Sequence, residues 1–472
     1  MAENINVIAF DCGNSSTRTI LCNYDGKKIS SELMLQETND IIEDNGYFFW
    51  DMDAVFDRMK RGLAMAAKKT HIDSVGICTW GIDFFLLDEA GEFLGRSLCY
   101  RNTIGADEES KLSEEAKKDM FYRTGILSDK INTVYMLKGM QTHFPDIIRN
   151  GKKILLVPDI LVYMLTGKAV NEPSELSTSG MIDVRTMTVD AGQCEYAGVD
   201  PDIFCEKGVH GTAIGNIKRE ILDELGIDYD IPVICVPSHD TACAVMAIPS
   251  RDDSYLFVSS GTWSLIGAMC EKPVINEAVR MSNLTNEQGG FGWTTLLRNS
   301  AGMFIVQRLK KEYEAENNCE IGWGDFTAIA NEWKEEAVIF DVNDARFFNP
   351  RVMVDEIQDA INPGTESHEW SEILASTYLS IGESFAQVLS NVKQCADGDY
   401  DKVYIVGGGC KNVMICQRCA DSLGMPVVTC DMECSSVGNA AAQLPYFHPE
   451  YDYRKLREII ADSLITKEFN PA

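Results

Sequence analysis

Residues 7–22 read Val7-Ile-Ala-Phe-Asp-Cys-Gly-Asn-Ser-Ser-Thr-Arg-Thr-Ile-Leu-Cys22, and this stretch decides the fold of the chain. The pattern predicts two short apolar strands, Val7–Phe10 and Thr19–Cys22, joined by a turn of small residues. Gly13 lets the backbone turn tightly, and Asp11 is an isolated carboxylate where the first strand ends.

The turn of this hairpin has the chemistry of a phosphate site. Successive backbone N–H groups in such a turn form a concavity that suits phosphate oxygens. Asp11 beside the turn is placed to hold a divalent cation, because hard cations take oxygen ligands. An ordinary β-hairpin with a polar tip is the alternative interpretation. The amide and hydroxyl donors of the turn are Asn14, Ser15, Ser16 and Thr17.

A second copy of this layout occurs about half the chain further on. Residues 255–269 read Tyr255-Leu-Phe-Val-Ser-Ser-Gly-Thr-Trp-Ser-Leu-Ile-Gly-Ala-Met269, and Gly261 stands where Gly13 stood. Each half is therefore expected to begin with its own hairpin. Two like domains facing each other across a cleft would hold a nucleotide phosphate tail from both sides, an arrangement that resembles the actin, hexokinase and Hsp70 group of ATP-binding folds.

Length and composition bound the class of protein. A chain of 472 residues favours two or three domains. The net charge of −30 argues against a nucleic-acid partner, which requires a basic surface. No apolar run is long enough to cross a membrane, and Met1–Asn4 does not begin a secretory signal. The sequence thus predicts a cytoplasmic protein.

The 16 cysteines are interpreted as reduced, mostly buried thiols. Cys416 and Cys419, with Cys430 and Cys434, have spacings compatible with zinc. However, residues 412–423 have the apolar stripe of a helix, which makes Cys416 and Cys419 core-facing residues. We therefore favour buried thiols over a metal site.

Predicted strands and helices alternate in both halves, which is the pattern of an α/β fold. The predicted helices include one of about 17 residues from Asp53 and a long one over 369–395. Residues 174–180 are predicted to be a loop that could contact a polyol. The tail from Pro445 is predicted to be a polar closing segment.

The sequence Trp80-Gly81-Ile82-Asp83 lies at a strand junction and suits a sugar. Gly81 permits close approach of the backbone, Trp80 offers an apolar wall, and Asp83 can accept hydrogen bonds from hydroxyl groups. A packed aromatic residue in a strand bend is the equally open alternative.

A second candidate junction is Pro237-Ser-His-Asp-Thr241, which follows the predicted strand 231–236. Asp240 there stands at the carboxyl end of a strand and at the start of a helix, the location where open α/β sheets place their chemistry. The alternative is that Asp240 only caps the helix. His239 by itself favours a hydrogen-bonded structural histidine.

A third junction, Lys402-Val-Tyr-Ile-Val-Gly-Gly-Gly-Cys-Lys-Asn412, lets backbone N–H groups approach a ligand closely. Three glycines alone are a weak signal. The dinucleotide fingerprint Gly-x-Gly-x-x-Gly is absent here, which argues against an oxidoreductase.

Taken together, the motifs resemble the FGGY family of carbohydrate kinases over nearly the whole chain, from Val7 to about Gln443. They are Asp11-Cys-Gly-Asn-Ser-Ser16, Thr79-Trp-Gly-Ile-Asp83, Ser238-His-Asp-Thr241, Ser259-Ser-Gly-Thr-Trp-Ser264, Arg346-Phe-Phe-Asn-Pro350 and Val406-Gly-Gly-Gly-Cys-Lys-Asn412.

This resemblance implies transfer of the γ-phosphate of ATP to the primary hydroxyl of a ketose. Asp240 would be the general base and Asp11 the partner of Mg²⁺. The first phosphate loop would be Asn14, Ser15, Ser16, Thr17 and Arg18, with Thr262 contacting phosphate from the second hairpin and Gln307, Gly408 and Gly409 holding the nucleoside. The sugar would be lined by Gly81, Asp83, His239, Asp240, Thr241 and Asn299.

The resemblance also implies two domains. Residues 1–243 would hold the sugar site and the first phosphate loop, and residues 244–472 the nucleotide site. The expected partners are small molecules, a sugar and ATP, with no nucleic acid and no membrane, and the expected state is a monomer or a homodimer.

Some residues depart from the family pattern near the sugar motif. The chain has Tyr100-Arg-Asn102 where Tyr-Arg-Asp is expected, and its Ser177-Thr-Ser-Gly-Met181 differs from the Thr-Thr-Gln-Leu type. A third departure, Thr17 in the first loop, is expected to leave phosphate binding intact. L-rhamnulose is the expected ketose, with L-fuculose and xylulose as alternatives. A catalytically silent relative that only binds nucleotide or sugar is the rival, against which both Asp11 and Asp240 argue.

Overall fold

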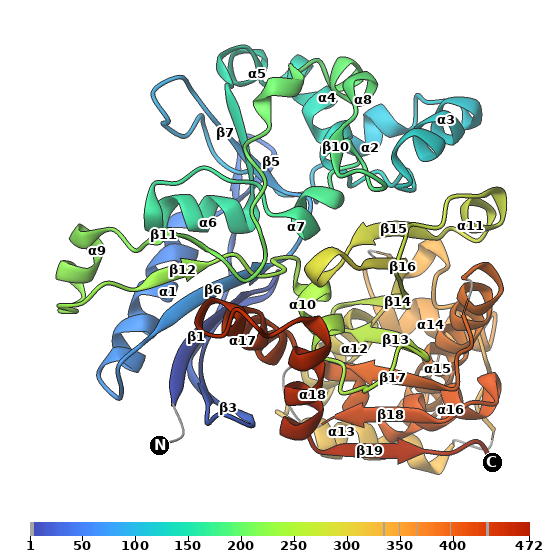
Figure 1. Cartoon of the computed structure of the whole chain (residues 1–472). Helices are drawn as coiled ribbons and strands as arrows, with labels where there is room; N and C mark the ends of the chain where they lie inside the picture. Colours follow the sequence, from blue (N-terminus) through green and yellow to red (C-terminus); the bar gives the residue numbers. More distant parts are fainter. Residues whose placement is uncertain (1–3, 334–335, 349, 366, 397, 431–433) are drawn as a thin grey trace. The chain divides into compact units, whose positions relative to one another are not determined.

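A computed structural model describes residues 4–333, 336–348, 350–365, 367–396, 398–430 and 434–472 (Figure 1). The chain forms two compact units. Unit 1 contains residues 1–251, 269–296 and 433–464, and unit 2 contains residues 252–268, 297–432 and 465–472. Two features of the sequence analysis lie partly outside the described residues: Met1 to Glu3 at the start of the chain, and Asn349 in the Arg346–Pro350 motif.

The core of unit 1 is a six-stranded sheet with strand order β11-β12-β6-β1-β2-β3. β1 pairs with β2 in antiparallel fashion and with β6 in parallel, and β12 also runs parallel to β6. The predicted hairpin of residues 7–22 is therefore confirmed. The strands are β1 (Ile5–Cys12), β2 (Ser16–Tyr24), β3 (Ile29–Thr38), β6 (Ser74–Thr79), β11 (Ala213–Asn216) and β12 (Pro232–Ile234).

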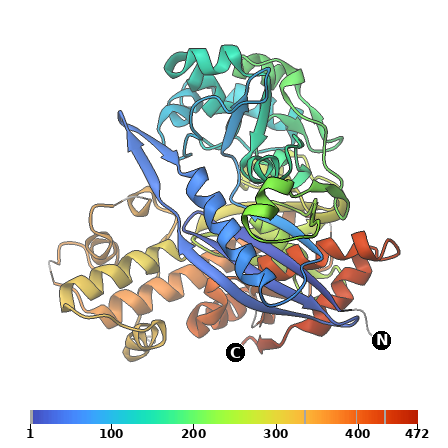
Figure 2. The same ribbon diagram turned by 90° about the vertical axis from the view of Figure 1, so that its left-hand side faces the viewer.

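Helices cover both faces of this sheet. α1 (Met52–Ala67) begins at Asp51, which accepts a hydrogen bond from the Ala54 N–H, and it contributes its apolar stripe to one core. Figure 2 shows α1, in blue, lying across the blue strands. α17 (Cys434–Phe447) packs on the other face, since Asn439 faces Gly76 while Val75 and Ile77 point toward α1.

A second core in unit 1 belongs to the chain between β5 (Tyr47–Trp50) and β11. Its strands are β7 (Phe84–Leu87) and β8 (Lys153–Leu156), which pair in antiparallel fashion. Its helices are α2 (Ile104–Glu109), α3 (Glu114–Thr124), α4 (Thr133–His143), α5 (Pro145–Asn150), α7 (Pro173–Ser177) and α8 (Ala191–Ala197). Helix α6 (Val157–Thr166) packs on β6.

Unit 2 repeats the arrangement of strands seen in unit 1. Its sheet has the order β15-β16-β14-β13-β17-β18-β19, in which β13 pairs with β14 in antiparallel fashion and with β17 in parallel. The second predicted hairpin is therefore confirmed as well. The strands are β13 (Tyr255–Ser260), β14 (Trp263–Cys270), β16 (Thr294–Ala301), β17 (Lys402–Val406), β18 (Val427–Cys430) and β19 (Thr466–Phe469), with β15 (Thr285–Gln288) assigned to unit 1.

The helices of unit 2 include the predicted long one, α15 (Trp370–Cys395), which packs against α16 (Val413–Leu423). Both helices carry an apolar stripe, and Cys416 and Cys419 are buried in the stripe of α16. α12 (Phe304–Asn317) packs against α14 (Met353–Ile361).

Two local predictions are wrong. The predicted loop 174–180 begins with helix α7, because Pro173 suits the first turn and Glu172 caps it with its side chain. The predicted polar tail contains α18 (Tyr453–Ser463) and the edge strand β19. β19 has three polar residues and one buried Phe469, so its sequence shows no strand pattern. The predicted domain boundary between residues 243 and 244 stays a prediction.

Within the described ranges, no helix combines the length and the apolar character required to span a membrane.

Candidate active site

The turn that follows β12 places Asp240 at the first residue of α10 (Asp240–Met246). Two elements hold this turn. The Thr79 N–H of β6 donates to the Ser238 carbonyl at 2.8 Å, and the His239 N–H donates to Ser174 Oγ of α7 at 3.0 Å. The Asp240 side chain is 36% exposed, so its carboxylate can reach a ligand.

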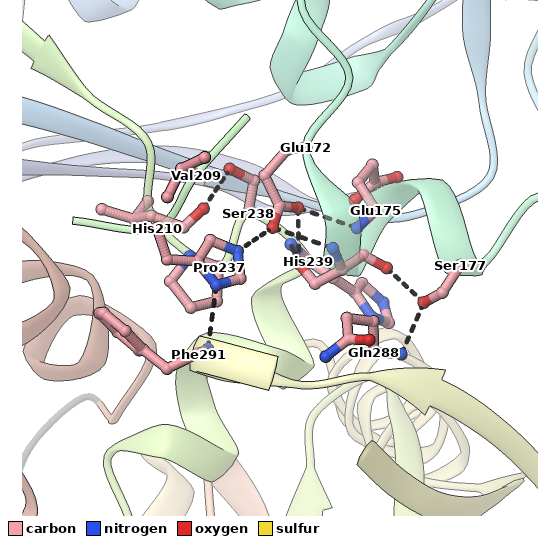
Figure 3. Close-up of polar contacts among 12 residues, drawn as sticks. Glu172, Glu175, Ser177, Val209, His210, Pro237, Ser238, His239, Gln288 and Phe291 are labelled. Carbon is pink, nitrogen blue, oxygen red and sulfur yellow. Dashed lines mark hydrogen bonds and ion pairs between the residues drawn. The ribbon is translucent and has the colours of Figure 1, made fainter. Parts of the chain in front are cut away.

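A buried carboxylate, Glu172, organises the support of this turn (Figure 3). It accepts hydrogen bonds from the N–H groups of Ser174 and Glu175 and from the Ser174 hydroxyl, which lies 2.6 Å away. Ser174 therefore links Glu172 directly to the backbone of His239. The local sequence explains this contact, since an acidic residue before Pro173 caps the helix that presents Ser174.

His210 completes the network at the far side of Glu172. Its Nε2 lies 2.5 Å from Glu172 Oε1, and its Nδ1 accepts the Phe291 N–H at 2.9 Å. Because Nδ1 accepts, the proton of the neutral ring must be on Nε2, which donates to Glu172. Burial alone would raise the pKa of Glu172, but the hydrogen bonds from His210 and Ser174 bring it below its ordinary value.

The imidazole of His239 lies between two carboxylates. Its Nδ1 is 3.2 Å from Glu287 Oε2 and its Nε2 is 3.6 Å from Asp240 Oδ1. Burial alone would lower the pKa of His239, but the charges of Glu287 and Asp240 raise it to about 9. The ring therefore carries a positive charge beside Asp240 at neutral pH.

Burial and two neighbouring charged groups set the pKa of Asp240. Burial raises its pKa, the neighbouring His239 lowers it, and the charge of Asp11 raises it. The Thr241 hydroxyl donates to Asp240 Oδ1 at 3.3 Å and helps to fix the side chain. An aspartate with a raised pKa and one carboxylate edge open to solvent is suited to accept a proton from a bound hydroxyl.

Gly81 packs close to the same site. A Cβ at this position would lie 3.3 Å from His239 Nε2 and 3.2 Å from Thr178 Cγ2, so a side chain here would be crowded. Ile82 has a φ of 72°, a strained value for a β-branched residue, and its N–H donates to Thr178 Oγ1 at 3.1 Å. The strain supports the interpretation that this junction is functional.

Asp83 supports the same junction from inside the protein. It is only 2% exposed, and its Oδ2 accepts from Trp50 Nε1 at 2.5 Å and from Trp80 Nε1 at 3.0 Å. Burial raises the pKa of Asp83 to about 7, against the lowering effect of these two hydrogen bonds. Because the Asp83 carboxylate already accepts hydrogen bonds from two indoles, we infer that Asp83 supports the junction and does not contact a sugar directly.

The turn between β1 and β2 is held by Asn39, a residue that sequence reasoning missed. The Asn39 side chain donates to the Gly13 carbonyl at 2.7 Å and accepts from the Thr17 hydroxyl at 2.7 Å. Thr17 is consequently buried and occupied, whereas Ser15 is exposed. The Asn14 Oδ1 atom is buried and has no hydrogen-bond partner among the described residues. Thr17 is thus occupied by the fold, whereas Asn14 and Ser15 remain suited to a ligand.

Asp11 lies beside this turn and is 2% exposed. Its Oδ2 is 2.6 Å from Arg18 Nη2 and accepts the Ser435 hydroxyl at 2.5 Å. No cluster of three or more potential metal ligands of the types His, Cys, Asp or Glu occurs in the part of the chain that the structure describes. Mg²⁺ needs only one or two carboxylates when substrate phosphates and waters supply the other ligands, so Asp11 fits such a role.

In unit 2, the turn of the second hairpin is bound to the start of α12. The Met303 N–H donates to the Gly261 carbonyl at 3.0 Å and the Phe304 N–H to the Thr262 carbonyl at 3.1 Å. A Cβ on Gly302 would lie 2.7 Å from the Thr262 oxygen, which explains the glycine at this position. The hairpin turn and the helix that carries the exposed Gln307 thus form one structure.

The glycine run of unit 2 packs against the end of β13. Gly407 has a φ of 82°, and a Cβ there would lie 2.7 Å from the Ser260 carbonyl oxygen, so only glycine fits. Asn412 then caps α16 by accepting the N–H groups of Met414 and Ile415. Gly408, in the short turn before this helix, is exposed.

The structure therefore distributes the predicted residues over the two units. Unit 1 holds Asp11, the first turn, Gly81, Asp83 and the residues His239 to Thr241, whereas unit 2 holds Thr262, Asn299, Gln307, Gly408 and Gly409. Ser174 lies in the stretch 174–180 that is expected to contact a polyol, whereas the residues that the sequence did not indicate are Asn39, Glu172, His210 and Glu287. No local motif marks them, because each acts through a contact distant in sequence.

Comparison with known proteins identifies the family. Residues 6–247 match the model of the N-terminal domain of the FGGY family of carbohydrate kinases, and residues 256–444 match the model of its C-terminal domain. The chain belongs to the FGGY family. The resemblance inferred from the motifs is thus confirmed.

Among the relatives of this FGGY kinase are proteins named rhamnulokinase. One from Oceanobacillus iheyensis is 32% identical over 461 residues, which cover 97% of this chain and 96% of that protein. Another from Bacteroides thetaiotaomicron is 30% identical over 476 residues, which cover 99% of this chain and 96% of that protein.

Solved structures confirm the fold of this FGGY kinase. A gluconate kinase from Lactobacillus acidophilus matches with a TM-score of 0.81 at 16% identity and covers 100% of this chain and 94% of that one. A Plasmodium falciparum glycerol kinase with ADP matches with a TM-score of 0.77 at 14% identity, covering 99% and 94%. The predicted two-domain α/β fold of the actin and hexokinase type is therefore confirmed.

Proposed function

We propose that this kinase transfers the γ-phosphate of ATP to the 1-hydroxyl of L-rhamnulose and forms L-rhamnulose 1-phosphate. The observation that carries this proposal is the set of relatives named rhamnulokinase, which are 30–32% identical and match at least 97% of the chain. The positions of Asp11 and Asp240 support catalysis and argue against a silent relative.

In the proposed reaction, Asp240 accepts the proton of the attacking hydroxyl. The carboxylate is fixed by Thr241 and lies at a helix start that two elements hold in place. Phosphoryl transfer needs mainly alignment and cancellation of charge, so one positioned base is sufficient. Gly81 and His239, which border Asp240, would contact the sugar.

Each unit carries candidate residues for the phosphate groups of ATP. The first turn would offer Asn14, Ser15 and Ser16, and Arg18 would add positive charge. Mg²⁺ bound through Asp11 would neutralise phosphate charge. The contacts from unit 2 would be Thr262 on the hairpin turn, Gln307 on α12, and Gly408 and Gly409 for the nucleoside, with Asn299 toward the sugar.

The departure at Asn102 has a structural explanation. Its side chain donates to the carbonyls of Phe48 and Cys99, both at 2.7 Å, and accepts the Phe48 N–H at 2.9 Å. An ionised aspartate could not donate these two hydrogen bonds. Asn102 is thus occupied by the fold, and its difference from the family pattern does not argue against L-rhamnulose.

We expect the chain to function as a monomer or homodimer whose partners are the sugar and ATP. Most of its 16 cysteines are buried, as expected of reduced thiols in the core, which supports a reducing compartment such as the cytoplasm. We further propose residues 1–243 as the domain of the sugar site and residues 244–472 as the domain of the nucleotide site.

A panel of ketoses tests the substrate. The purified enzyme is given L-rhamnulose, L-fuculose and xylulose with ATP and Mg²⁺, and ADP release is coupled to a spectroscopic signal. We expect the highest kcat/KM with L-rhamnulose. A higher kcat/KM with another ketose would overturn the choice of sugar, and absence of turnover on every ketose would favour a silent binding protein.

The link from α7 to the base gives a second test. Ser174→Ala removes the acceptor of the His239 N–H and one donor to Glu172, so we expect kcat to fall by about tenfold through a looser Asp240. KM for ATP should not change. Steady-state kinetics measure kcat and KM, and thermal unfolding measures the stability of the variant.

Ser179→Ala is the matched control. Ser179 is equally buried on the same segment, but among the described residues its hydroxyl donates to the Leu176 carbonyl and accepts from the Met181 N–H, both within the segment. We expect it to reduce stability with kcat unchanged. Equal losses of kcat in the two variants would show that Ser174 has no specific positioning role.

A further inference from the structure

The two ring nitrogens of His239 both face carboxylate oxygens. Nδ1 lies 3.2 Å from Oε2 of Glu287, and Nε2 lies 3.6 Å from Oδ1 of Asp240. A neutral imidazole has one N–H and one lone pair, so one of these contacts would set a lone pair against a carboxylate. The imidazolium, with a proton on each nitrogen, makes both contacts attractive: the one to Glu287 at hydrogen-bond distance and the one to Asp240 as a longer ion pair.

The orientation of this ring is fixed from several directions. The His239 N–H donates to Ser174 Oγ at 3.0 Å, and Gly81 lies beside the ring, since a Cβ at Gly81 would be 3.3 Å from Nε2. Glu287 comes from β15, where its own carbonyl accepts the Thr295 hydroxyl at 3.3 Å, and the next residue, Gln288, donates its N–H to Ser177 Oγ at 2.8 Å. These two hydrogen bonds fix the backbone at Glu287 and at the next residue, Gln288.

Acidic groups dominate the remaining surroundings. Glu287 of β15 and Asp240 of α10 face the ring, Glu172 and Glu175 contribute from α7, and Asp11 of β1 acts on Asp240. Glu175 is fully buried, its two oxygens have no hydrogen-bond partner among the described residues, and burial raises its pKa well above the ordinary value. Burial thus disfavours the charged form of Glu175.

A cation at His239 consequently has a defined effect. Without it, Asp240 would face Asp11 and the buried acids, and its carboxylate would be disfavoured as a base. With it, Asp240 stays ionised beside the position where a hydroxyl must lose its proton.

We propose that Glu287 is a positioning residue of the kinase, which acts through His239 by holding the imidazolium with Nε2 toward Asp240. The proposal rests on the proposed function in that Asp240 is the base. It assigns to the loop and strand after α11 (Glu277–Met281) a part in catalysis that no motif of the sequence indicates.

The wild-type protein gives the first test, and it needs no substrate. The chain has 6 histidines, so ¹⁵N-histidine labelling with a His239→Gln variant assigns the signal of His239. We expect both ring nitrogens of His239 to have the shifts of a protonated ring at pH 7. A neutral His239 at pH 7 would overturn the proposal.

Glu287→Gln gives the second test, because glutamine keeps a hydrogen-bond acceptor for Nδ1 but removes the charge. We expect His239 to become neutral at pH 7 and kcat/KM for the sugar to fall by about tenfold, with the acidic limb of the pH profile moved upward by about one unit. KM for ATP should stay unchanged. In a His239→Gln background, Glu287→Gln should have no further effect on kcat/KM.

Glu277→Gln is the control, since Glu277 lies on the same chain segment but pairs with Arg280 on the surface. It should change neither the His239 signal nor the kinetics. The proposal fails if Glu287→Gln leaves His239 protonated, or if its effect on kcat/KM persists without His239. A different sugar preference, or full turnover by an Asp240 variant, would instead contradict the proposed function while the signal of His239 stayed as expected.

Discussion

Replacing Asp240 with asparagine is expected to lower kcat by roughly 10²–10⁴, which is the usual contribution of a positioned general base. Asparagine keeps the shape of the side chain and can still accept the hydrogen bond of the Thr241 hydroxyl. It cannot take up a proton. The loss should therefore appear in kcat, with KM for ATP little changed.

Stability should not decrease in this variant. Burial and the charge of Asp11 raise the pKa of Asp240, so removal of the carboxylate charge relieves a cost of the folded state. Thermal unfolding and ATP titration calorimetry separate these effects from loss of fold or of nucleotide binding.

Asp223→Asn is a suitable control, because Asp223 pairs with Arg219 on the exposed face of α9 (Arg219–Glu224). It should leave kcat unchanged. Turnover of Asp240→Asn within a few-fold of the wild type would remove Asp240 from the role of base.

The second large effect concerns stability and its dependence on pH. Asp83 has a pKa of about 7 in the folded protein, compared with an ordinary value of 3.8, because burial disfavours its charge. Between these two values the folded state binds a proton that the unfolded state does not. The stabilisation is therefore complete below pH 3.8 and is lost as the pH rises to about 7. The loss amounts to roughly 4 kcal/mol over this window.

Asp83→Asn removes this dependence, because asparagine does not titrate and its carbonyl can accept from the indoles of Trp50 and Trp80. We expect the Tm of the wild type relative to the variant to fall by several degrees between pH 5 and pH 8. Differential scanning calorimetry at both pH values measures it. A difference in Tm that is the same at both pH values would show that Asp83 does not change its protonation on unfolding.

The hairpins and junction motifs were predictable from sequence because each is a local pattern. Each hairpin pattern, around Gly13 and around Gly261, spans only about a dozen residues. The start of α10 is likewise indicated by the apolar run directly before Asp240. The family motifs then relate these separate positions to one activity.

Other features could not be predicted, because they depend on contacts between distant segments. Nothing near Asp83 indicates that Trp50 occupies its carboxylate, and nothing near Thr17 indicates that Asn39 takes its hydroxyl. His239 looked like a structural histidine in isolation. Its charge became apparent only when β15 brought Glu287 to within 3.2 Å.

Unit 1 is built from segments that lie far apart in the sequence, and this has a consequence for folding during synthesis. Its sheet is covered on one face by α17, where the Ser74 hydroxyl donates to Gln443 and Gly438 lies against the backbone of Cys243. These partners leave the ribosome long after the strands that they cover. The N-terminal half must then wait with an uncovered apolar face, and we expect the first 250 residues expressed as a fragment to require chaperones or to aggregate.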